Sequence, residues 1–124
     1  LAHDLAEALG MKPFEIPAGS RAAYHAAASM ASNFLIALES SAAALLDAAG
    51  IDDARELLAP LVLRSAANWA EAGDAALTGP IARGDEATVA RHLEAIAATA
   101  PELEDLYRAL AERTREIASE GARA

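Results

Sequence analysis

The chain has 124 residues, no cysteine and a formal net charge of −9. This length suits one domain with a core of its own, and the lack of cysteine excludes a disulfide framework and thiolate chemistry. Lys and Arg form no basic cluster, so we expect a soluble cytoplasmic protein that does not bind nucleic acid. Alanine is abundant, aromatic residues make up 4%, and long runs of strand-forming residues are missing, which predicts an all-α fold.

The first nine residues have the apolar spacing of a short amphipathic helix, which Gly10 would end. Residues 12–16 (KPFEI) alternate weakly between Pro13 and Pro17, as in an extended segment or a single edge strand. One strand cannot make a sheet, so its partners would lie in a part of the protein that is missing from this chain.

The chain starts with Leu1 rather than Met, in the middle of an apolar pattern. We therefore expect it to be a piece of a longer protein whose missing part lies upstream. Residues 1–19 would link to that part, and residues 20–124 would form a helical domain.

One long helix is predicted from about residue 20 to residue 49, with Ser20 as its N-cap and Gly50 as its stop. At about 1.5 Å per residue it would span roughly 45 Å. We expect a helical bundle built around it.

Three more helices are predicted. Asp52 or Asp53 would cap a segment at residues 54–59, and Pro60 would restart or kink the helix that continues to about residue 72. After an irregular stretch at 73–85, the expected elements are a helix at 86–98 capped by Asp85, and a last helix that opens with Pro101 and ends near Ser119.

The seventeen residues from Ala22 to Leu38 carry no formal charge. Four polar residues interrupt this apolar run and fall on one side of a helix at about 100° per residue: His25, Ser29, Ser32 and Asn33. Buried polar groups are costly without partners, so this stripe needs a polar neighbouring helix or a ligand pocket. The run is too short and too rich in hydroxyl groups for a membrane span, and we expect no membrane contact.

Asn33 and His25 each have two interpretations. Asn33 either points its amide into a pocket or makes an interhelical hydrogen bond, to Asn68 or to a backbone carbonyl. His25 is either a general acid, because imidazole titrates near neutral pH, or a partly buried histidine near the start of the helix. Ser29 and Ser32 could merely let another helix approach closely.

The segment at 77–85 (LTGPIARGD) is a loop whose glycines allow unusual backbone angles and whose proline restricts one. Thr78 and Arg83 are its polar candidates. Arg83 could bind a carboxylate in bidentate fashion or lock the loop to Asp85 or a carbonyl. The loop lacks the Lys-Ser/Thr ending of a Walker loop, and the histidines show no metal-ligand spacing, so no metal site is expected.

Two stretches, YHAAASMASNFLIAL at 24–38 and LTGPIARGDEATVARHL at 77–93, resemble domain-of-unknown-function family 2520, a C-terminal domain that follows a Rossmann-like NAD(P)-binding domain. The resemblance implies a helical domain like those of the 6-phosphogluconate dehydrogenase superfamily. Such domains close the cleft over the nicotinamide, contact the substrate and usually form a homodimer. NAD(P) would be bound mainly by the missing upstream domain.

In several dehydrogenases of that superfamily, a lysine and an asparagine lie one turn apart on the long helix. Asn33 matches the asparagine, but Ser29 stands at the lysine position, which would pass the acid role to His25. The resemblance and the polar stripe together give His25 and Asn33 as catalytic candidates. The substrate-binding candidates are Ser29, Ser32, Asn68, Thr78 and Arg83.

The first functional hypothesis is the substrate-binding and dimerisation domain of an NAD(P)-dependent oxidoreductase that acts on a small keto or imino acid and is inactive as this domain alone. The alternative is a non-catalytic helical module for oligomerisation or ligand sensing. In either case the apolar surfaces of helices 20–49 and 60–72 would pack against a second copy.

Overall fold

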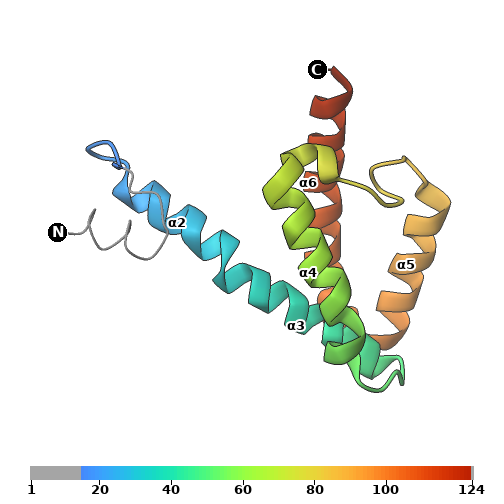
Figure 1. Ribbon diagram of the computed structural model, residues 1–124. Helices are drawn as coiled ribbons and strands as arrows, with labels where there is room; N and C mark the ends of the chain where they lie inside the picture. The colour runs from blue at the N-terminus through green and yellow to red at the C-terminus, as the bar shows by residue number, and fades with distance from the viewer. Residues whose placement is uncertain (1–14, 124) are drawn as a thin grey trace. The chain divides into compact units, whose positions relative to one another are not determined.

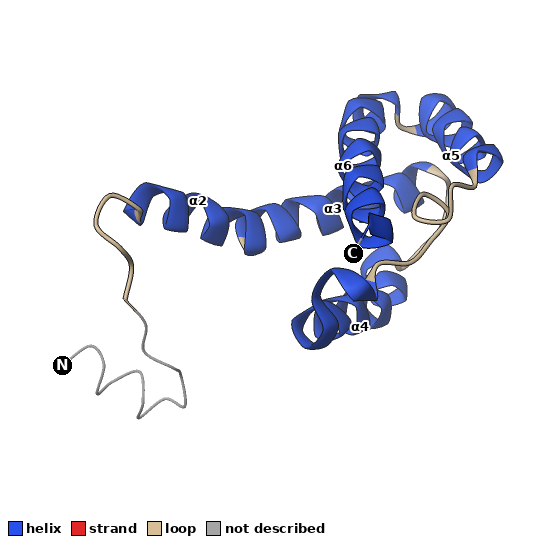
Figure 2. Ribbon diagram, turned by 90° about the horizontal axis from the view of Figure 1, so that it is seen from above, coloured by secondary structure: helices blue, strands red, loops and turns tan. Residues whose placement is uncertain are grey.

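The computed structural model describes residues 15–123, and this part of the chain is helix and loop without a strand (Figure 2). The predicted all-α class is therefore confirmed. The elements, labelled in Figure 1 where space allows, are α2 (Arg21–Ala31), α3 (Asn33–Ala48), α4 (Ala54–Ala72), the 3₁₀ turn η1 (Gly73–Ala76), α5 (Glu86–Thr99), the 3₁₀ turn η2 (Pro101–Leu103) and α6 (Glu104–Arg123).

The chain divides into two compact units, residues 1–37 and 38–124. In the first unit, Ser20 is the N-cap of α2 as predicted, although its side chain makes no capping hydrogen bond. Its carbonyl instead accepts the first helical hydrogen bond, from the Tyr24 amide at 3.0 Å. The predicted helix at 1–9 and most of the extended segment at 12–16 lie outside the described residues, and Glu15 and Ile16 are not in a strand.

The long helix differs from its prediction at Ser32, which separates α2 from α3 with backbone angles φ −119° and ψ −70°. The Ser32 hydroxyl donates a hydrogen bond to the Ala28 carbonyl at 2.6 Å, a bond of the kind that often bends helices. The backbone bonds from Ser32 N to Ala28 O (3.0 Å) and from Ile36 N to Ser32 O (3.2 Å) continue through the interruption. The helical register is therefore kept.

The combined helix Arg21–Ala48 has 28 residues and is long and apolar enough to cross a membrane, by length and composition only. No part of its most apolar window is buried in the structure. Signal sequences and core helices of soluble proteins share these properties, so the expected absence of membrane contact stays a prediction.

In the second unit, Gly50 follows the end of α3 with a positive φ of 80°, and the Ile51 amide reaches back to the Leu46 carbonyl at 2.9 Å. This is the glycine stop that the sequence predicts. Helix α4 then continues through Pro60 rather than restarting there. Because Pro60 has no amide proton, it cannot serve the carbonyl one turn earlier, at the exposed Glu56.

Helix α5 starts as predicted. The Asp85 carboxylate accepts hydrogen bonds from the Thr88 amide at 3.2 Å and from the Thr88 hydroxyl at 2.7 Å. By contrast, Asp53 stands before α4 in a left-handed conformation (φ 58°) without a capping bond. The last helix is preceded by the 3₁₀ turn at Pro101 and continues to Arg123, beyond the predicted end near Ser119.

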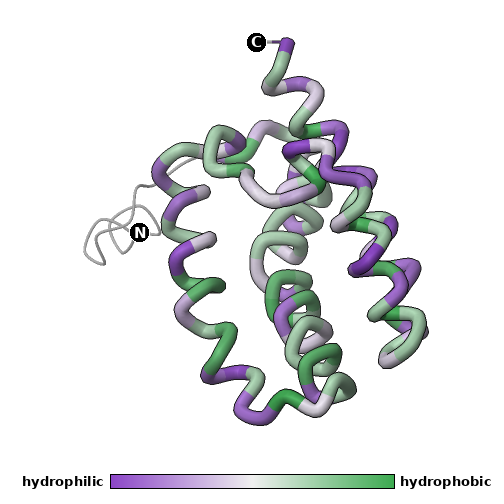
Figure 3. Tube along the Cα trace, turned by 90° about the vertical axis from the view of Figure 1, so that its right-hand side faces the viewer, coloured by the Kyte–Doolittle hydropathy of each residue, from purple (hydrophilic) through white to green (hydrophobic). Residues whose placement is uncertain are grey.

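Helix α5 and η2 pack against α6, and η1 also contacts α6. The buried hydrophobic side chains of the described residues are few and mostly small: Ala54, Val89, Ile96, Ala100 and Ala111. Figure 3 shows hydrophilic and hydrophobic residues alternating along the helices. Such alternation is typical of helices with one face toward a core and one toward water.

Candidate functional site

The predicted polar stripe lies on α2 and at the start of α3, in the first unit. Its members are accessible: His25, Ser32 and Asn33 are exposed and Ser29 is half-buried. Neither α2 nor α3 contains a buried residue and Ser32 between them is exposed, so none of the four is enclosed in a core of the described chain. Since the helical register is kept at Ser32, all four lie within about 100° of one another around the helix.

The stripe has its own hydrogen bonds at Ser32. Its hydroxyl oxygen lies 2.6 Å from the Ala28 carbonyl oxygen and 3.0 Å from Asn33 Oδ1. A hydroxyl has one proton, so Ser32 donates to only one of these two acceptors at a time. Ser32 holds the Asn33 amide only while it donates to Oδ1, and it offers a ligand lone pairs rather than a free proton.

His25 stands beside an aromatic ring. The centroids of the Tyr24 and His25 rings are 5.8 Å apart, and their planes are inclined at 55°. Both side chains are exposed. The predicted acid role and the alternative of a partly buried histidine both stay predictions.

The other predicted residues lie in the second unit. Asn68 is exposed on α4, and Thr78 and Arg83 are exposed on the loop between η1 and α5. The predicted hydrogen bond from Asn33 to Asn68 stays a prediction, as does the convergence of the loop with the stripe. The structure thus brings together four predicted residues on one helix face and two on one loop.

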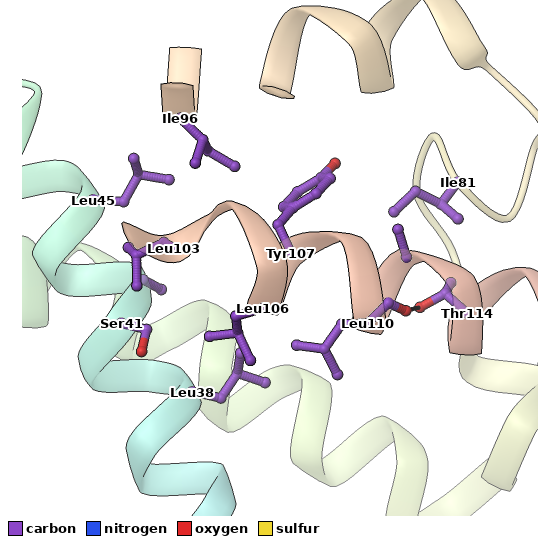
Figure 4. A pocket seen from close by; sticks show the side chains of 12 residues that line it. Leu38, Ser41, Leu45, Ile81, Ile96, Leu103, Leu106, Tyr107, Leu110 and Thr114 are labelled. Carbon is purple, nitrogen blue, oxygen red and sulfur yellow. Dashed lines mark hydrogen bonds between the residues drawn. The ribbon is translucent and has the colours of Figure 1, made fainter. Parts of the chain in front are cut away.

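The loop at 77–85 is folded on itself by backbone hydrogen bonds. The Asp85 amide donates to the Pro80 carbonyl at 2.8 Å, and Gly84 donates to Ile81 at 3.1 Å. Gly79 and Gly84 have positive φ angles of 99° and 72°, which favour glycine. This geometry points Ile81 toward α6 (Figure 4). Arg83 is exposed.

The alternative partner of Arg83, Asp85, uses its carboxylate to cap α5. Hydrogen bonds from the Thr88 hydroxyl and amide hold the pKa of Asp85 below its usual value, with smaller contributions from the charges of Arg83 and Arg91. The attraction between Arg83 and Asp85 is thus long-range, and the guanidinium stays exposed to solvent.

A cavity of about 350 Å³ was not predicted. It lies within the second unit, between α3, the loop, α5 and α6, and contains none of the seven predicted residues (Figure 4). Its lining has no charged side chain: Leu38, Ser41, Ala42, Leu45, Ile81, Ile96, Leu103, Leu106, Tyr107, Leu110, Ala111 and Thr114. The signal in the sequence was the helical spacing of these apolar positions in α3 and α6, which is also the ordinary pattern of a core.

Tyr107 connects this cavity to His92. The Tyr107 hydroxyl lies 2.8 Å from His92 Nδ1, and the two rings meet edge to face with centroids 6.0 Å apart. Burial raises the pKa of Tyr107, and the charge of Arg115 opposes this effect. The pair joins α5 to α6, as does the ion pair between Glu86 and Arg115 at 3.3 Å.

Among the described residues, no three potential metal ligands lie close enough together to hold an ion. The expected absence of a metal site stays a prediction, since the chain extends beyond these residues.

Comparison with curated proteins and with solved structures gave no match. Comparison with protein families gave one, described as "Domain of unknown function (DUF2520)", over residues 1–114. This range includes the polar stripe, Asn68, the loop at 77–85 and all of the cavity lining. The chain therefore belongs to the DUF2520 family.

Proposed function

We propose that this chain is the substrate-binding and dimerisation domain of a cytoplasmic NAD(P)-dependent oxidoreductase that acts on a small keto or imino acid. Family membership supports the comparison with domains that follow a Rossmann-like domain. The observation that carries the proposal is the polar stripe on α2 and the start of α3, whose amide, hydroxyl and imidazole groups remain accessible along one helix face.

The stripe suits a substrate and the neutral carboxamide of a nicotinamide better than a whole dinucleotide. The chain has no GxGxxG sequence for a pyrophosphate, so its residues would complete a site held mainly by another domain. When bound, the cofactor supplies hydride chemistry. This chain's contribution is to orient the substrate and to move a proton.

Asn33 carries both a donor and an acceptor group and can orient a carbonyl or imine. Its Oδ1 lies 3.0 Å from the Ser32 hydroxyl oxygen and accepts that hydroxyl's proton when Ser32 does not donate it to Ala28. His25 can donate a proton from its imidazolium ring as negative charge develops on the substrate oxygen. Arg83 is exposed, and its guanidinium can bind the carboxylate of the keto or imino acid through two parallel hydrogen bonds.

The test measures turnover of the natural full-length protein with NADH or NADPH and a set of 2-oxo acids and cyclic imines. Asn33→Ala should lower kcat by about 10²-fold without loss of helicity, the scale for removing one well-placed donor. His25→Gln should flatten the pH–rate profile between about pH 6 and 8. His92→Gln is the matched control, because His92 bonds to Tyr107 rather than lying on the stripe.

Unchanged turnover in Asn33→Ala and His25→Gln, together with lower melting temperatures, would contradict the proposal. That result would mean that the polar stripe has a structural role, as a contact between helices. Absence of cofactor binding by the full-length protein would contradict it more directly.

The second candidate function, a ligand-sensing module, is favoured by the uncharged cavity, whose lining contains none of the predicted site residues. Its volume is within the range of small-molecule sites, and its lining suits a neutral apolar compound. The probe is a neutral naphthylamine dye that fluoresces in apolar surroundings. Ala42→Phe should abolish its binding by filling the cavity, whereas Ala44→Phe, on an exposed position of the same helix, should not.

A further inference from the structure

The second feature of the combined helix α2–α3 is an apolar face formed by Ala23, Ala27, Met30 and Phe34, here called the 23–34 face. The spacing of four, three and four residues places these side chains within about 60° around the helix. All four are exposed, including Met30 at 66% and Phe34 at 61%. Two large apolar side chains one turn apart, both open to water, indicate a surface that packs against something else.

Charge favours a second copy of the chain as the partner. With a net charge of −9, two copies repel each other unless the contact lies where charges are absent. The 23–34 face lies inside the seventeen-residue uncharged stretch from Ala22 to Leu38. Within this stretch, a second copy meets no acidic side chain.

The sizes of the side chains favour one orientation. When two copies of the helix run antiparallel about a two-fold axis between residues 28 and 29, position 23 faces position 34 and position 27 faces position 30. Each large side chain then meets a small one: Phe34 packs over Ala23, and Met30 over Ala27. In a parallel pair each residue would meet itself, with Phe34 against Phe34 and alanine against alanine.

We propose that two copies of this chain pair through their 23–34 faces as antiparallel helices, related by a two-fold axis between residues 28 and 29. The proposal names the contact in the dimer and to that extent rests on the proposed function. It also determines where the polar stripe lies in the dimer. The stripe centres roughly 150° around the helix from the 23–34 face, so it stays open in the pair.

The first experiment measures the mass of the full chain by sedimentation at micromolar concentration. The chain as it stands should sediment as a dimer, and Phe34→Glu should sediment as a monomer, because the new charge would be buried against Ala23. Ile36→Glu is the matched control. Ile36 is 68% exposed and lies about 200° around the helix from Phe34, so this variant should remain a dimer.

The second experiment tests the orientation by oxidation, using the absence of native cysteine. A mixture of Ala23→Cys and Phe34→Cys chains should give a mixed disulfide. Ala23→Cys alone should give none, because the antiparallel pair separates its two sulfur atoms by about 11 residues, or roughly 16 Å. A disulfide in Ala23→Cys alone would show parallel pairing and overturn the proposal.

Other occupants of the face give other results. A monomer that binds vesicles of phosphatidylcholine, with Phe34→Glu abolishing the binding, would assign the face to a membrane. Dissociation of both Glu variants would place the contact elsewhere on the helix. The two proposals can fail separately. Unchanged turnover in Asn33→Ala, together with a mixed disulfide that still forms, would contradict the proposed function and leave the helix pairing intact.

Discussion

The two units of this chain use the same alanine-rich helices in opposite ways. The described part of the first unit, residues 15–37, contains no buried residue, whereas the second unit encloses the five buried hydrophobic residues of the described chain. In the second unit, α5 and α6 lie against each other, and an ion pair joins them. A helix with no buried side chain gains nothing from such packing, so its apolar surface is available for a partner.

The sequence already contains the cause of this difference. In α5 and the residue after it, apolar positions recur at 89, 93, 96 and 100, and charged residues occupy the other side. One face is thereby selected for the core. In the stretch from Ala22 to Leu38, apolar residues lie on several sides and no charge marks a solvent face.

The largest expected effect compares one substitution in the two units. Ile96→Ala should lower the free energy of unfolding by about 2–5 kcal/mol, because Ile96 is 2% exposed and its removal leaves a cavity. Ile36→Ala should change it by less than about 0.5 kcal/mol, because Ile36 is 68% exposed. Urea denaturation of the two variants measures both values. Equal losses would show that the surface around Ile36 is covered.

A smaller effect compares the aspartates that precede α4 and α5. Asp85→Ala should lower the melting temperature by a few degrees, because the Thr88 amide loses its acceptor. Asp53→Asn should leave it nearly unchanged, since Asp53 makes no capping bond and asparagine tolerates a positive φ. Thermal unfolding followed by circular dichroism measures both.

The same cap predicts a pH dependence. The pKa of Asp85 is lower in the folded state than its ordinary value of 3.8, so its stabilising effect is fully present above that value. The effect is lost as pH falls through the folded-state pKa. The difference in melting temperature between the wild-type chain and Asp85→Ala should therefore disappear in acid. A difference in melting temperature that persists in acid would show that the capping effect does not depend on the charge of the Asp85 carboxylate.

The smallest effect is expected at the contact between α5 and α6. Tyr107→Phe should cost less than about 1 kcal/mol, because it removes one hydrogen bond to the exposed His92. Adding His92→Gln to Tyr107→Phe should cost little more, since the bond is already gone. Denaturation of the two single variants and the double variant measures this coupling. Additive losses would show that the two side chains act independently.

Local signals predicted much of the fold correctly. Gly50 ends α3 and Asp85 caps α5, because each of these effects depends on a few neighbouring residues. The effects of Ser32 and Pro60 were harder to predict. A serine hydroxyl can bond either to the preceding turn or to solvent. Helix α4 tolerates Pro60 because the missing amide leaves only the carbonyl of the exposed Glu56 without its helical partner. The cavity was missed because its lining comes from four segments that are distant in the sequence.

The sequence by itself determined the all-α class, most helix ends, and the polar stripe on one side of α2, since these follow from composition and from a period of 3.6 residues. Only the tertiary structure decided that α2 buries nothing within the described chain, that Ile81 and Tyr107 line one cavity, and that Asp85 rather than Asp53 makes a capping bond. Burial and side-chain contacts depend on which distant segments meet. Helical periodicity states only which residues share a face.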